Sequence, residues 1–513
     1  MTTSIIVTGL TPTYKVPGVF METQFGAGRL SNGSAPLKML VIGLKGSSGS
    51  ITLDGTPQLA LSEDDVNALV QPGGEAARMA YQALRVPNVS LYIACPTPAG
   101  GAVQATATIT ITSTPPHAST GEWRYRISGI LVSGAISTTA TQNALATAIG
   151  AAINARTDLP VTATVATNVV TLTVKCAGIR GNQYILMQDT TQLPSTVTSA
   201  IAGGSSVTGG GVFFTSGAGT ESVSTLLANI SAVEYARIAH AQNDTTNLPL
   251  IETWLFDQSA FDVDILQNSC CAVNGDLSAA TTLATVTLNT ERIQLLAMQN
   301  GESHPSEIAA RWMSYRSVYE QIDPAASSQY DGYALTGIAP QTQDSDRWTK
   351  AEQNTLLNNG VTPVTTNDNG DAVIVRSITT KCLTNSVADF RTLGTERPSA
   401  ADFIRHGLDT LGASFIAQNP RVQDNPAQGQ RPPNPNIATP AAWEKVMQKY
   451  AIDLAAGNSN VVSSGLSVIT NIDENQPVAQ YDPNAGRIMF VFPFEVANGN
   501  HQLGGLVRVT NNG

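Results

Sequence analysis

Charged residues are scarce in this chain of 513 residues, where Asp, Glu, Lys and Arg together make up 13%. Soluble domains usually hold about 25%, and here Gly, Thr, Ala, Ser and Asn take the place of the missing charges. Because few charges keep copies apart, the composition favours a surface that partners cover. The formal net charge of −11 argues against nucleic-acid binding, which needs clustered Lys and Arg.

Cysteine is scarce as well, with five residues and no C-x-x-C pair: Cys95, Cys176, Cys270, Cys271 and Cys382. This odd number favours buried thiols in a reducing compartment over a disulfide framework. The first residues lack the basic and apolar segments of a signal peptide. No run approaches the roughly 20 apolar residues that a membrane span needs. We therefore expect folding in a cytoplasm and no membrane insertion.

Motifs of catalysis and cofactor binding are missing too. The turn Gly43–Gly49 lacks the Gly-Lys-Ser/Thr ending of a phosphate-binding loop, and there is no G-x-S-x-G elbow. The five histidines are far apart, and the acidic pairs near Asp262 and Asp344 do not continue into a complete calcium loop. The sequence therefore predicts no enzyme, no catalytic residue, no cofactor and no metal.

Alternating strand-like and helix-like segments predict an α/β domain in two pieces, residues 31–100 and 212–335. Leu37–Gly43 and Val89–Ala94 are short apolar runs of the kind buried in parallel sheets. The alternation continues after residue 212, with one helix expected over Phe261–Gln267. This order favours a doubly wound, mainly parallel sheet.

Residues 101–211 differ in composition, with only eight charged residues. Ala105–Thr112 and Val169–Val174 alternate as strands do, and Ala140–Asn154 has the pattern of a helix. The segment ends in the glycine-rich run Gly203–Gly211. We expect a β-rich domain inserted into the α/β domain.

The stretch Tyr333–Thr380 has the pattern of a strand, a helix and a hairpin. Thr349 and Glu352 have capping-box spacing, Gly360 suits the end of the helix, and Asn369-Gly370 is a hairpin turn. The stretch is interpreted as a packing motif that opens a C-terminal domain. That domain is expected to span residues 336–496 and to hold two amphipathic helices and a very apolar strand. The remaining termini are expected to be extended arms, residues 1–30 and 497–513.

Four features together resemble contractile tail sheath proteins, particularly the Mu-type phage sheath. They span almost the whole chain, although each alone is weak. They are the arm Val16–Glu22; the stretch from Thr336–Pro340 to Arg376–Thr380; the insert segments Ala144–Ala155, Leu159–Ala163 and Gly178–Asn182; and the order of elements after residue 390. One departure is Lys381-Cys382, where the family more often has an aromatic residue.

The resemblance implies a structural subunit rather than an enzyme. Sheath subunits form stacked hexameric rings around a tail tube and contract to drive it through the target cell envelope. The energy lies in a metastable extended lattice. The implied partners are further copies of the chain, the tube protein, and baseplate and tail terminator proteins. The implied location is a virion tail, or a tail-like injection particle, assembled in a bacterial cytoplasm.

In the family each terminal arm adds a strand to a sheet of a neighbouring subunit, the C-terminal domain faces the tube, and inserted domains face outward. The implied arm residues are Val16, Val19, Phe20, Met21, Leu503, Leu506, Val507 and Val509. The implied receiving sheet contains Val373, Val375, Ile378, Ile488, Phe490 and Phe492. Lys445 and Lys449 share one helix face that could meet an acidic tube patch or simply face solvent.

A different class also fits the sequence: a non-contractile tail structural or receptor-binding protein that uses the Thr/Gly-rich insert. The two terminal arms separate the alternatives, because a self-contained adhesin or enzyme has no need of them.

Overall fold

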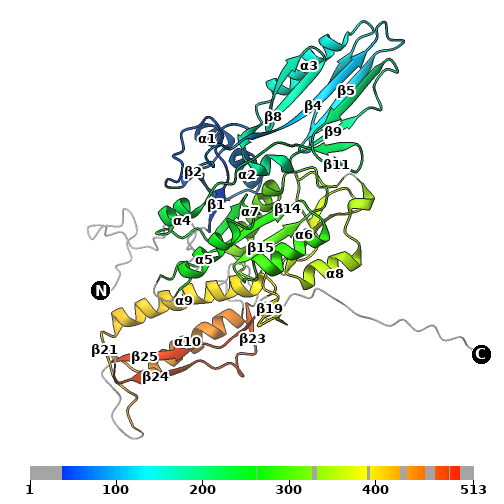
Figure 1. Ribbon diagram of the computed structural model, residues 1–513. Coiled ribbons are helices and arrows are strands. Elements are labelled where there is room, and N and C mark those ends of the chain that lie inside the picture. The colour runs from blue at the N-terminus through cyan, green and yellow to red at the C-terminus, as the bar shows by residue number, and fades with distance from the viewer. Residues whose placement is uncertain are drawn as a thin grey trace, which may run out of the picture.

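The computed structural model describes residues 37–260, 263–325, 332–341, 343–389, 393–427, 436–456, 468–484 and 486–496. These residues form three parts in a row (Figure 1). We call them the insert (residues 104–213), the body (the described residues of 37–103 and 214–395) and the C-terminal unit (the described residues of 396–496). The expected terminal arms, including all eight arm residues, lie outside the described residues.

The body is built on a nine-stranded sheet with the order β16-β18-β17-β15-β14-β13-β1-β3-β2. The six strands from β17 to β3 run parallel, whereas β18 and β2 run antiparallel to their inner neighbours. The strands are β1 (Lys38–Ile42), β2 (Gln58–Ala60), β3 (Ser90–Ala94), β13 (Arg237–His240), β14 (Asn268–Val273), β15 (Ile293–Ala297), β16 (Tyr333–Ala334), β17 (Val361–Thr366) and β18 (Ala372–Ile374).

Helices cover both faces of this sheet because its central strands are apolar on both sides. In β1, Met39 and Val41 enter one core, and Leu40 and Ile42 enter the other. The mixed α/β class predicted from the sequence is confirmed. The first core includes α1 (Glu63–Leu69), α2 (Glu75–Leu84) and α7 (Pro305–Ile322), and the second includes α4 (Ser224–Ile230), α5 (Leu248–Gln258), α6 (Leu277–Thr282) and α8 (Lys350–Asn358).

Two details differ from the sequence prediction. The helix before β14 is α5, not Phe261–Gln267, and residues 263–267 contain no helix. Pro249 stands in the first turn of α5, where its missing N–H costs nothing. The second detail is the boundary at residue 336. Strands β17 and β18 extend the body sheet, with Leu295 paired to Val361, so the body continues beyond that residue.

The insert consists of two sheets and one helix around a core of its own. In β4 the side chains of Ala105, Ala107, Ile109 and Ile111 are buried, and the threonines alternate with them. One sheet has the order β10-β4-β8-β7, the other β11-β12-β9-β5-β6. The elements are β4 (Gln104–Ser113), β5 (Gly121–Ile127), β6 (Ile130–Ile136), α3 (Gln142–Ala155), β7 (Val161–Ala166), β8 (Val169–Ala177), η1 (Ile179–Gln183), β9 (Ile185–Asp189), β10 (Val197–Ala202), β11 (Ser206–Val207) and β12 (Gly211–Phe213).

The C-terminal unit packs two helices against a small hairpin (Figure 1). The apolar run expected as one strand over Arg487–Val496 is two strands. Pro493, which cannot donate to a sheet ladder, lies between them. The elements are α9 (Glu396–Gln418), β21 (Arg421–Val422), β22 (Ile437–Ala438), α10 (Pro440–Ala455), β23 (Ile469–Thr470), β24 (Val478–Asp482), β25 (Arg487–Val491) and β26 (Glu495–Val496). A short hairpin of β19 (Leu383–Thr384) and β20 (Val387–Ala388) precedes this unit.

Candidate functional site

The order of the parallel strands singles out one place in the body for a ligand site. From β1 the chain adds β3 on one side and β13 on the other. In doubly wound sheets, ligands bind beyond the carboxyl ends of the strands at such a switch point. The residues that gather there decide what the body can do chemically.

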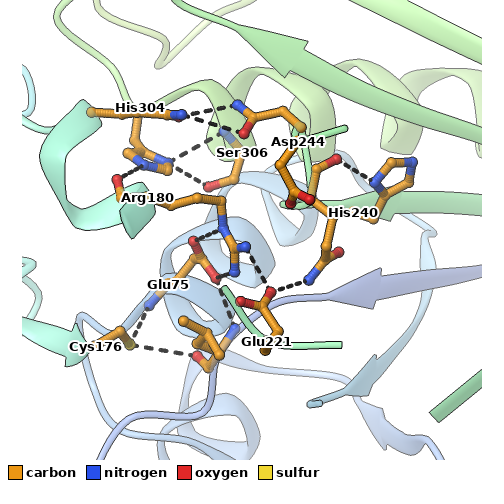
Figure 2. Close-up of polar contacts among 12 residues, drawn as sticks. Glu75, Cys176, Arg180, Glu221, His240, Asp244, His304 and Ser306 are labelled. Carbon is orange, nitrogen blue, oxygen red and sulfur yellow. Dashed lines mark hydrogen bonds and ion pairs between the residues drawn. The ribbon is translucent and has the colours of Figure 1, made fainter. Parts of the chain in front are cut away.

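A buried arginine from the insert occupies this place (Figure 2). Arg180, in η1, donates from Nε and Nη2 to the two carboxylate oxygens of Glu75 at 2.8 and 2.9 Å. Its Nη1 lies 2.6 Å from Glu221 Oε1. All three side chains are at most 3% exposed. Burial opposes ionisation of Glu75, but Arg180 outweighs it and lowers the pKa of that carboxyl.

Each carboxylate also accepts a second donor, at an oxygen that Arg180 already contacts. Glu75, at the start of α2, accepts from the backbone N–H of Leu44 at 2.8 Å. Glu221 accepts from the Gln242 amide at 2.8 Å. The triad of Glu75, Arg180 and Glu221 is therefore held by residues that follow β1 and β13.

Three titratable groups near the triad, Cys176, His240 and His304, stay uncharged near neutral pH. Burial raises the pKa of the Cys176 thiol to about 12, and its sulfur accepts from the Glu75 N–H at 3.3 Å. Burial lowers the pKa of His240 to about 4. His304 stacks on Tyr184, accepts from the Ser306 N–H and donates to the Arg180 carbonyl at 3.2 Å. Neither a thiolate nor a poised base stands beside the triad.

The geometry thus describes a junction rather than a reaction centre. One cation from the insert is paired with two carboxylates of the body in a buried place, and each carboxylate has a further fixed donor. Within the described ranges, no group of three or more His, Cys, Asp or Glu side chains could hold a metal ion. None of the described helices is long and apolar enough to cross a membrane.

The C-terminal unit presents a second candidate site, a groove of about 340 Å³. The aromatic rings of Phe415, Trp443 and Phe490 line it, with ring centroids 5.1 and 5.6 Å apart on either side of Trp443. Beside the groove, the hairpin leaves large apolar side chains in solvent: Val478, Met489, Phe490 and Val491 are 44–66% exposed. The small core of this unit is a cluster of seven buried apolar residues among those that the structure describes.

The six residues expected to form one receiving sheet are divided between two parts of the molecule. Val373 lies in β18, which already pairs with β16 and β17 and so has no free edge. Val375 follows it, and Ile378 is a buried residue in a bridge to Gly394. The six residues therefore do not share one sheet, because strand-like periodicity does not say which sheet a strand joins. The receiving role of this half stays a prediction.

The other half lies together in the C-terminal unit. Ile488 and Phe490 are on β25, and Phe492 follows it and packs on the small core. In the described part of the chain, β25 pairs only with β24. The two lysines proposed for the tube are exposed on one face of α10, and Lys449 forms an ion pair with Asp453 at 2.9 Å.

Sequence reasoning did not find the buried triad. Its members stand at positions 75, 180 and 221, in three different elements or loops, and no spacing connects them. The segment Gly178–Asn182, which contains Arg180, is one of those that carry the family resemblance, but nothing in its sequence indicates that the charge is buried.

No protein-family model and no curated protein matches this chain. Solved structures match nearly its whole length. A sheath tail protein from Desulfitobacterium hafniense is 12% identical, with 94% of this chain and 100% of that chain covered and a TM-score of 0.46. A sheath tail protein from Listeria innocua is 11% identical, with 91% of this chain and 93% of that chain covered and a TM-score of 0.46. A chain of the helical sheath of the anti-feeding prophage, in its contracted state, is 10% identical. The match covers 97% of this chain and 99% of that chain, with a TM-score of 0.48.

Proposed function

We propose that this chain is the repeating subunit of a contractile tail sheath. In this proposal copies stack as hexameric rings around a tail tube and contract to drive it through a cell envelope. The energy is stored in a metastable extended lattice with two packings of the same interfaces. The four sequence features given above support this function, together with the surface of the C-terminal unit.

The observation that carries the proposal is that the C-terminal unit has a small core and leaves large apolar side chains exposed. A two-stranded hairpin is marginally stable by itself, and this one exposes Val478, Met489, Phe490 and Val491. Burying one such side chain stabilises by roughly 1.5–3 kcal/mol. A second molecule that covers the hairpin therefore gains the burial free energy of several apolar side chains. A gain of this kind favours repeated assembly of copies.

The second edge of β25, which has no partner strand among the residues that the structure describes, is the proposed acceptor for a neighbour's arm. An added strand forms main-chain hydrogen bonds that demand no particular side chain. Ile488 and Phe490 lie on the strand that would receive the arm, and Phe492 directly follows it. Residues 13–25 or 500–512 of another copy would supply the added strand. Such an extended link can persist while subunits rotate past one another.

The other interfaces follow from the same proposal. The C-terminal unit would face the tube, with Lys445 and Lys449 opposite acidic groups, and the insert would face outward. Baseplate and tail terminator proteins would cover the two ends of the stack. The subunit would act without catalysis, as part of a virion tail or tail-like particle.

Assembly of the purified full-length protein tests this function. We expect hollow cylinders in negative-stain electron micrographs without added partners. Deletion of residues 1–22, or of 499–513, should leave folded subunits that form no cylinders, because each arm links neighbours. A monodisperse full-length monomer at high concentration would contradict the sheath function. Long tubes from both truncated forms would instead contradict the role of the arms.

A further inference from the structure

Helix α7 is a buried helix that carries four charged side chains. Glu307, Arg311, Arg316 and Glu320 are each at most 4% exposed, and every residue from 305 to 317 is buried. A buried charge costs several kcal/mol unless a well-placed partner neutralises it. The ion-pair and hydrogen-bond partners of α7 therefore indicate the structural role of its charged side chains.

The beginning of α7 holds the insert. Just before the helix, Glu302 accepts both arms of the Arg126 guanidinium, from β5, at 2.8 and 2.9 Å. His304 donates to the carbonyl of Arg180 in η1. Glu307 accepts from Arg78 of α2 at 2.6 and 3.0 Å, and Arg78 also reaches the insert carbonyl of Asp158 at 3.5 Å.

The end of α7 holds the first turns of α9. Glu320 lies 2.7 Å from Arg316 and 2.6 Å from Arg237. The Ser399 hydroxyl, on α9, accepts from both arginines at 3.2 Å and donates to Glu320 at 3.1 Å. Close by, Asp402 of α9 accepts from Arg292 at 2.9 and 3.0 Å.

Buried apolar side chains of α9 pack in the core of the C-terminal unit rather than in the two cores of the body. Ala400 and Ile404 belong to the small core that α9 shares with Tyr450 and Leu454 of α10. Helix α9 therefore joins the C-terminal unit to the body. Its apolar side chains pack in the unit, and its polar side chains form ion pairs and hydrogen bonds with the body.

We infer that α7 connects two separable anchors. One anchor, at the beginning of α7, holds the insert, and the other, in the last turns of α7, holds the C-terminal unit. Glu302 and Glu307 form the first anchor, and Glu320 with Ser399 forms the second. Helix α7 thus contacts both outer parts, in addition to the Arg180 triad on the insert side and the Arg292–Asp402 pair on the α9 side. Ser399 is a positioning residue for α10 and the hairpin. This inference rests on the contacts of a single subunit and does not depend on the sheath function.

Hydrogen exchange read by mass spectrometry, on full-length protein kept dilute, tests the two anchors separately. Ser399→Ala should speed exchange in α10 and in β24–β25 about two- to tenfold, the range set by one net hydrogen bond, with the insert unchanged. Arg126→Met should speed exchange in β5 and β6 while α10 stays as in the native protein.

Ser314→Ala is the matched control. Ser314 is also a fully buried helical serine, but its hydroxyl donates only to the Arg311 carbonyl of its own helix, so neither outer part should respond. If Ser399→Ala does not fold, Glu320→Gln, which changes the α7 member of the same anchor, is read in the same way. A response confined to residues 395–406, or one that spreads equally to the insert and α10, would overturn the inference.

Discussion

At the scale of single residues, the most consequential feature is Arg180 between Glu75 and Glu221. The guanidinium of Arg180 satisfies two carboxylates that would otherwise repel each other in a place without solvent. Because the arginine belongs to the insert and both acids to the body, one side chain joins two parts of the molecule. It also fills the point at which related sheet topologies bind ligands.

Arg180→Met should therefore be severely destabilising. The substitution leaves two buried carboxylates without their cation, which costs about 3–5 kcal/mol of unfolding free energy. Urea unfolding, followed by circular dichroism, would show the loss as a lower midpoint.

Arg156→Met is the control for this change. Arg156 also forms a close ion pair, with Asp158 at 2.7 Å, but both side chains are 43% exposed. An exposed pair contributes less than about 1 kcal/mol. Equal midpoint shifts for the two variants would show that burial of the triad has no special role.

At the scale of elements, α8 and the strand after it follow local rules closely. The Thr349 hydroxyl accepts from the Glu352 N–H at 3.3 Å, and the Glu352 carboxylate accepts from the Thr349 N–H at 2.8 Å. The predicted capping box is thus confirmed. Past the helix end, Gly360 has a φ of 74° and leads directly into β17.

Gly360→Ala should cost more than Gly370→Ala, although both glycines have positive φ. A Cβ at Gly360 would lie 2.6 Å from the Thr380 carbonyl oxygen, whereas one at Gly370 meets nothing within 4 Å. Left-handed backbone alone costs an alanine about 1–2 kcal/mol. The clash should add about 1–3 kcal/mol at Gly360, measured as the difference between the two urea midpoints. Equal costs would mean that the contact with Thr380 relaxes freely.

At the scale of the whole molecule, the three parts differ in how completely they fold within one chain. The body and the insert each bury extensive apolar cores. The C-terminal unit buries few residues and leaves an apolar hairpin in solvent. Its stability should therefore rise when a neighbour covers the hairpin, because binding to the folded form shifts the folding equilibrium.

Val491→Ser should raise the protein concentration needed for cylinder formation about tenfold. Losing the burial of one valine at the interface removes roughly 1.5 kcal/mol, which corresponds to about tenfold in affinity. The measurement is the protein left in the supernatant after the cylinders are pelleted.

Val286→Ser, in the body, is the control for this effect. Val286 is 77% exposed, compared with 66% for Val491, so the two changes alter the free subunit alike. The control should assemble as the native chain does. If both variants assemble normally, the hairpin is not the surface that copies bury.

Much of this molecule follows from the sequence by itself, because the relevant contacts are local. The α/β class, the capping box at Thr349 and the turn at Gly370 depend on residues a few positions apart or on simple periodicity. The tertiary structure alone decided that Val373 joins the body sheet while Phe490 lies in the C-terminal unit. It alone brought Arg180 to Glu75 and Glu221, and Ser399 to Glu320. Those contacts join distant segments, and strand period or residue type cannot specify which distant partner lies alongside.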